Sequence, residues 1–173
     1  LGSEHAAATT AAGLNGVITL ARSVVYDGEL SDAVEQLESG AITRDTYYLL
    51  ARDYLDRKFS REENCTFALF FRMSSPGELI YTSQSYSAAV HFQQDVQGEL
   101  AALSGELDTH CCFLMRNGRT YLVRNLHNAR LQLYGMLVIG LNADSLLAPL
   151  KANAEAWKAG YAVSLGLWQY GEF

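Results

Sequence analysis

The first sixty residues carry apolar side chains at helical spacing. In residues 5–26 these side chains recur three, four and seven positions apart, which places them in one stripe along a long helix. The members of the stripe are Leu14, Val17, Ile18, Ala21, Val24 and Val25. Asp27 and Gly28 follow directly, and glycine commonly ends a helix. The pattern predicts a helix over residues 5–26 that packs by one face.

Two shorter segments with apolar residues at helical spacing predict two further helices before residue 60. One spans residues 32–38, with Ser31 as its N-cap, and the other spans residues 45–59, with Thr43 as its N-cap. The charged side of the longer helix is typical of a face that lies in water.

After Asn64 the pattern changes to short apolar runs separated by turn residues, which predict strands. Between the second and third of these strands lies an expected helix of residues 87–103. The expected strands cover residues 65–73, 78–83, 111–116, 121–126 and 134–141. Asn117-Gly118 joins two of them and is a strong signal for a two-residue hairpin.

The chain then predicts a helix over residues 143–158, broken or kinked at Pro149, and residues 160–167 are a candidate last strand. This order predicts an α+β fold with an antiparallel sheet of five to six strands and a long N-terminal helix. We expect a single domain over residues 1–173, with a helical part at 1–60 and a sheet core at 64–167. Because 49% of the residues are apolar and only two are proline, the composition suits such a core.

The charge balance excludes one class of partner. The net charge is −6, and the 13 lysines and arginines are scattered, so the sequence predicts no nucleic-acid binding. No apolar run reaches the roughly 18 residues of a membrane span. The chain begins with Leu1, so we expect a piece of a longer protein or a processed chain, with Gly2-Ser3 resembling a cloning remnant. Membrane spans of a parent protein would lie outside this piece.

Reactive side chains form no convincing catalytic or metal-binding pattern. His110 and Cys112 would share a strand face, but no paired metal-ligand spacing accompanies them, so the sequence predicts neither a metal nor another cofactor. Cys65 could form a disulfide with Cys111 or Cys112, while the simpler interpretation is three small buried side chains. No nucleophile elbow or phosphate-binding glycine loop is present, and we expect no enzymatic activity in this domain.

Three arginines lie among apolar strand residues, namely Arg72, Arg116 and Arg124. An arginine on a sheet face is costly to bury without an anion, and its planar fork suits a carboxylate or phosphate. Arg124 is the sharpest candidate for a ligand clamp, because Leu122 and Leu126 share its face. The alternative is that each arginine lies in water at a strand edge, with its stem covering apolar surface.

Tyrosine is abundant, with ten in the chain, and four of them lie where a pocket could form. Tyr81 and Tyr86 flank the end of the second expected strand, and Tyr121 and Tyr134 lie on later ones. Tyrosine supplies both the apolar wall and the polar tip that a ligand pocket needs. Half-buried core tyrosines with wet hydroxyls explain the same pattern.

These segments resemble the Cache family, which comprises PAS-like extracytoplasmic sensor domains of bacterial histidine kinases and chemoreceptors. The N-terminal helix is similar to that family's long first helix, and the two hairpins and the closing glycine-punctuated strand are similar to its sheet. The matching segments are residues 5–26, residues 67–83 with Ser-Pro-Gly-Glu-Leu-Ile-Tyr at 75–81, residues 115–126, and residues 134–142 followed by Leu146 and Leu150.

The resemblance implies a PAS-like fold that holds a small ligand between the sheet and the helix and loops that cross it. The residues at the corresponding positions are candidates for ligand binding, and they are Arg72, Tyr81, Ser83, Tyr86, Arg116, Tyr121 and Arg124. The family's amino-acid-binding motif is not present in full.

We therefore expect the extracytoplasmic ligand-sensing domain of a membrane-bound signal-transduction protein, in the first place a two-component histidine kinase. Its partner would be a small, anionic molecule, and its first helix could pair with a second copy in a homodimer. Packing of that helix on its own sheet explains the same apolar stripe. The alternative function is a cytoplasmic interaction module of PAS, GAF or profilin-like build that binds no ligand.

Overall fold

The computed structural model describes the backbone of residues 2–151 and the side-chain surroundings of residues 4–149. Its fold is α+β, with a five-stranded antiparallel sheet and a long N-terminal helix, as predicted. The expected strand of residues 160–167, and the part of the expected last helix beyond Lys151, lie outside the described residues. In chain order the elements are α1 (Gly2–Asp27), α2 (Glu29–Glu38), α3 (Arg44–Phe59), β1 (Cys65–Arg72), β2 (Ser75–Tyr81), α4 (Tyr86–Asp95), η1 (Gln97–Glu99), α5 (Leu100–Leu107), β3 (Cys111–Arg116), β4 (Arg119–His127), β5 (Leu133–Leu141) and α6 (Ala143–Lys151).

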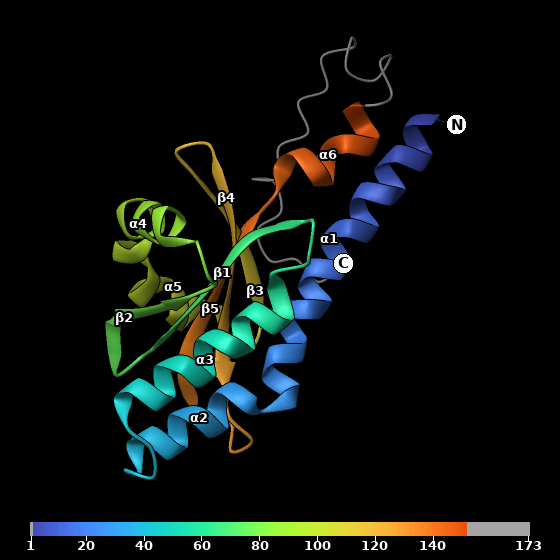
Figure 1. Cartoon of the computed structure of the whole chain (residues 1–173). Helices are drawn as coiled ribbons and strands as arrows, with labels where there is room; N and C mark the ends of the chain where they lie inside the picture. The colour runs from blue at the N-terminus through green and yellow to red at the C-terminus, as the bar shows by residue number, and fades with distance from the viewer. Residues whose placement is uncertain (1, 152–173) are drawn as a thin grey trace.

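The sheet is sandwiched between two groups of helices. Its strand order is β2-β1-β5-β4-β3, and every neighbouring pair is antiparallel. α1, α2, α3 and α6 contribute to the core on one face, while α4 and α5 cover the other (Figure 1). We call these the α1–α3 face and the α4 face. Because successive strand residues point to opposite faces, Phe70 and Leu137 belong to the first core and Leu69 and Val138 to the second.

The helix ends follow local capping chemistry, with one correction. Thr43 is the N-cap of α3, as predicted, and its Oγ1 accepts a hydrogen bond from the Thr46 N–H at 3.2 Å. The prediction that Ser31 caps the second helix was wrong, because α2 begins at Glu29. Gly28 is the N-cap of α2 and has a φ of 73°, which glycine adopts readily, so one residue separates α1 from α2 and α2 begins earlier than the apolar pattern indicates.

The expected helix of residues 87–103 is three elements in the structure. α4 ends at Asp95, η1 follows, and α5 continues through Gly105 to Leu107. The break falls at Val96, whose φ of −132° leaves the helical region. Val96 is nevertheless buried in the second core, so the apolar spacing across residues 92–103 reflects packing on the sheet more than one continuous helix.

Two proline positions also differ from expectation. β2 begins at Ser75, so Pro76 lies within a strand; β2 is an edge strand, where a missing N–H is tolerated. α6 is continuous through Pro149 to Lys151, so a break at Pro149 is wrong within the described residues, while a kink there stays a prediction. Packing of Leu146 in the first core helps to offset the hydrogen bond that Pro149 cannot make.

β5 contains two glycines, and close contacts with β1 explain why each position has no side chain. A Cβ added at Gly135 would lie 2.5 Å from the Phe70 ring, and one at Gly140 would lie 2.3 Å from the Phe67 ring. Since Phe70 packs in the first core and Phe67 in the second, each glycine admits a phenylalanine of β1 on a different face of the sheet.

Candidate functional site

A pocket of about 440 Å³ opens at one end of the sheet, beside the N-terminal half of α4. It exists because the strands end at different heights. Tyr121 on β4 pairs with Gly140 on β5, but Thr120 and Arg119 pair only with β3, so the β3–β4 hairpin extends past the end of β5. β5 then leaves the sheet to become α6. The pocket fills the space between that hairpin, β1 and α4.

The pocket wall combines apolar surface with hydrogen-bonding groups. Phe67, Ala88 and Leu141 contribute the apolar part. Two of the described lining residues carry basic side chains, the Arg119 guanidinium and the His91 imidazole. None of the described lining residues carries a carboxylate. The Arg119 side chain is 42% exposed, so part of it is accessible to solvent.

Behind Arg119 lies a carboxylate that is fully engaged. The Asp95 side chain is only 2% exposed and accepts hydrogen bonds from Asn117 Nδ2 at 2.7 Å, Tyr121 Oη at 2.7 Å and Arg119 Nη1 at 3.1 Å. Burial alone would raise the pKa of Asp95, but these hydrogen bonds outweigh it and hold the pKa below its ordinary value. The last residue of α4 is thereby tied to the β3–β4 hairpin. Burial raises the pKa of Tyr121, and the hydrogen bond to the Asp95 carboxylate raises it further.

The opposite wall is tied down from the other side of the sheet. The loop after β2 contributes Gln84 and Ser85 to the pocket. Asp56 of α3 accepts hydrogen bonds from the Ser83 N–H at 2.8 Å and the Ser83 hydroxyl at 2.6 Å. Gln84 has a φ of 64°, a conformation that few residues other than glycine adopt readily. A strained residue at a pocket wall is a pattern found at binding sites.

Of the seven predicted ligand residues, Tyr121 lines this pocket. Ser83 lies one residue from the pocket wall, and its hydroxyl bonds Asp56. Tyr86 is the first residue of α4 and is 71% exposed, while Tyr81 packs against the second core. Arg116 is an exposed partner of Glu99, with a distance of 2.7 Å between Nη2 and Oε2.

Arg72 and Arg124 lie on the other face of the sheet. Arg124 is 7% exposed and pairs in register with Cys111 and Leu137, both in the core of the α1–α3 face. The Arg72 guanidinium lies 5.4 Å from the ring centre of Tyr47 in α3, and 3.6 Å from Glu78. The structure therefore does not bring the three arginines together. An anion clamp at Arg124 stays a prediction, and it would concern a site separate from this pocket.

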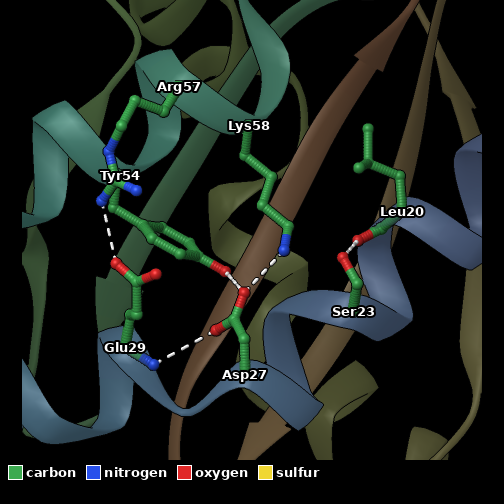
Figure 2. A network of polar contacts seen from close by, with 7 residues as sticks. All are labelled: Leu20, Ser23, Asp27, Glu29, Tyr54, Arg57 and Lys58. Carbon is green, nitrogen blue, oxygen red and sulfur yellow. Dashed lines mark hydrogen bonds and ion pairs between the residues drawn. The ribbon is translucent and has the colours of Figure 1, made fainter.

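Figure 2 shows a second polar network, at the corner where α1 meets α2 and α3. Asp27 accepts hydrogen bonds from Tyr54 at 2.5 Å, Lys58 at 2.6 Å and the Glu29 N–H at 3.1 Å. Burial alone would raise the pKa of Asp27, but the bonds from Lys58 and Tyr54 lower it overall. Burial of the Tyr54 hydroxyl and its hydrogen bond to Asp27 both raise the pKa of Tyr54. These groups bond to one another and tie the helices together.

Sequence reasoning missed His91, Asp95 and Arg119. His91 and Asp95 are four residues apart on a helix, a spacing that puts them on one side, and this signal was present in the sequence. Arg119 directly follows the Asn117-Gly118 turn and could have been placed at the tip of the hairpin.

The described cysteines and metal-type side chains form neither a reactive thiol site nor a metal site. Cys111 and Cys112 pack on opposite faces of the sheet, as alternation predicts. Burial raises the pKa of Cys65 to about 12 and of Cys112 to about 11, which makes both poor nucleophiles. Across residues 2–151 no group of three or more histidine, cysteine, aspartate or glutamate side chains is arranged to hold a metal ion.

Comparisons with known proteins do not place the chain in a family. No protein-family model matches it, and no curated protein matches it. None of the helices described in the structure is long and apolar enough to cross a membrane.

Proposed function

We propose that this chain is the sensory domain of a membrane-anchored signalling protein and that it binds a small anionic molecule in the pocket beside α4. The observation that carries the proposal is the composition of the pocket wall. Its described lining presents a guanidinium and an imidazole, but no carboxylate. A histidine kinase as the parent protein, and an extracytoplasmic location, follow from the resemblance to Cache domains and belong to the same proposal.

The size and chemistry of the pocket suit this role. Its volume of about 440 Å³ lies within the range of small-molecule sites. Arg119 can bond a carboxylate through two parallel N–H groups, and the first turn of α4 at Ser87 and Ala88 adds a weak positive potential. Phe67 and Leu141 would contact an apolar part of the ligand.

The position of the pocket offers a physical route for a signal. Gly140, Leu141 and Ala143 line it, and Ala143 begins α6. α6 packs against α1, where the Thr10 hydroxyl donates to the Leu146 carbonyl at 3.0 Å (Figure 1). A ligand that favours one placement of α6 would shift the population of α1–α6 arrangements. A difference in affinity of about 1–3 kcal/mol between two arrangements is enough for a usable response.

A melting-temperature screen of small carboxylates and phosphates tests the proposal. A ligand at about one hundred times its Kd stabilises the folded state by about 2.7 kcal/mol. For a chain of this size that corresponds to a rise of roughly 5–11 °C in Tm.

Two tryptophan variants in α4 identify the site. Ser87→Trp puts a large side chain at an exposed position on the pocket wall and should abolish the rise. Gln94→Trp makes the same kind of change at an exposed position of α4 outside the pocket and should preserve it. Equal rises in both variants would place the ligand elsewhere.

One observation favours the alternative of an interaction module without a ligand. The middle of the α4 face is filled by the chain's own side chains, since Phe92, Val96 and Leu107 are each at most 1% exposed. Hollows of this face in the described part of the chain lie at its margins, at the pocket beside α4 and at a second one of about 380 Å³ between α5 and β3, which Arg116 lines. A screen in which no anion raises the melting temperature would favour the module. In the parent gene, an apolar span before Leu1 and another beyond Phe173 would favour the sensor.

A further inference from the structure

Asp95 stands directly behind the cationic wall of the pocket. It follows the pocket residue His91 by one helical turn on α4. Two of its three hydrogen-bond donors, Arg119 and Tyr121, are themselves lining residues. An anion that bonds Arg119 therefore also approaches the Asp95 carboxylate.

We propose that Asp95 is a specificity-determining residue, which restricts the pocket to monoanionic ligands such as monocarboxylates and disfavours dianions. This inference rests on the proposed function and names the ligand class for the same pocket. It concerns the balance of charge around the pocket and needs no rearrangement of the backbone.

The charge balance follows from the contacts. Arg119 is the one guanidinium of the described lining, and Asp95 already shares it through the 3.1 Å bond to Nη1. The other guanidinium nitrogens remain for one ligand carboxylate, because a planar guanidinium has five N–H donors. A second negative charge on the ligand would meet no further guanidinium among the described lining residues, and it would be repelled by Asp95.

The Asp95 carboxylate has no free face for a direct contact with the ligand. Its side chain is 2% exposed, and both of its oxygens accept hydrogen bonds from the hairpin. It therefore acts on the ligand through its charge and through Arg119, without a contact of its own.

Butyrate and succinate are suitable probes, because they have the same number of carbon atoms and differ by one carboxylate. Their Kd values would be measured by titration calorimetry at about pH 7.5, where both are fully ionised, and at constant ionic strength. The wild-type protein should bind butyrate more tightly than succinate. Asp95→Asn, which keeps the size of the side chain and a hydrogen-bond acceptor, should improve succinate binding relative to butyrate by roughly threefold to tenfold.

Two further variants make the test specific. Asp53→Asn removes the same charge at an exposed position of α3 and should leave the succinate-to-butyrate ratio unchanged. Asn117→Gly, at a position where φ is 52°, removes the hydrogen bond from Nδ2 to Asp95, leaves the Asp95 charge less compensated and should move the ratio further against succinate. Because Asn117→Gly has the opposite expected sign, it keeps the inference testable if Asp95→Asn does not fold.

The outcomes separate this inference from the proposed function. Butyrate binding with the same succinate-to-butyrate ratio in wild type, Asp95→Asn and Asn117→Gly would overturn the role of Asp95 and leave the anion pocket standing. A wild-type preference for succinate would also overturn it. Failure of every anion in the melting-temperature screen and of both probes would overturn the proposed function, and the inference with it.

Discussion

Gly140 gives the sharpest test of how β5 packs against β1. A Cβ at this position would lie 2.3 Å from Phe67 Cε1 and 2.4 Å from Thr66 Oγ1, both too short for real contacts. Thr66 is exposed and can rotate away, but Phe67 is 5% exposed and its ring packs edge-on against Tyr121 at 6.2 Å. We expect Gly140→Ala to lower the free energy of unfolding by about 1–3 kcal/mol, as overpacked cores do. At this chain length the melting temperature should fall by roughly 2–12 °C.

The matched control is Gly16→Ala, the same chemical change with the opposite expected sign. Gly16 lies in α1, is exposed, and an added Cβ there would meet no atom within 4 Å. Alanine in a helix should raise stability by about 0.5–1 kcal/mol. Urea unfolding with an unchanged slope would measure both effects. If Gly140→Ala is as stable as wild type, the Phe67 ring does not lie against β5 and the reasoning fails. If it is destabilised, adding Phe67→Leu should recover part of the loss in a double-mutant cycle.

Two further predictions concern buried polar groups. Asn125→Ala removes the amide that donates to the Ser104 carbonyl at 2.8 Å and the Asp108 carbonyl at 3.1 Å, at the end of α5, and should lower the free energy of unfolding in urea by about 1–3 kcal/mol. The pKa of Asp27 is lower in the folded state than its ordinary value of 3.8, so its contribution to stability is present above that value and is lost as the pH falls through the folded pKa. The urea midpoint of the wild type should therefore drop as the pH falls below about 4, and Asp27→Asn should show a shallower drop than Asp45→Asn. Equal pH slopes in the two variants would contradict this assignment.

The parts of the fold that could be predicted from the sequence depend on local signals. The apolar stripe of α1, the Thr43 cap and the Asn117-Gly118 turn each act over a few residues, and all three are present in the structure. The division of residues 87–103 could not be predicted, because the apolar spacing there is set by contact with the sheet. The early start of α2 depends on one φ angle at Gly28, which the apolar pattern does not report.

The site was predicted less well, for a reason specific to sheets. Alternation shows which strand residues share a face, but it does not show which face remains open. Arg124 was assigned to the face of Leu122 and Leu126, and the structure agrees; that face is covered by α1–α3. The open pocket lies at the end of the other face, where its cation comes from Arg119 at the start of β4.

The pocket lies at the point where the backbone pairing of β4 with β5 ends. Beyond Gly140, the hairpin at Arg119 no longer pairs with β5, and the facing wall is the loop at Gln84. Two aspartates tie these segments to helices. Asp95 of α4 accepts hydrogen bonds from the hairpin, and Asp56 of α3 accepts hydrogen bonds from the loop. Segments held by side chains open at lower free energy than the strands of a core. A ligand between the two walls would therefore act on segments that side-chain hydrogen bonds hold, next to the residues that begin α6.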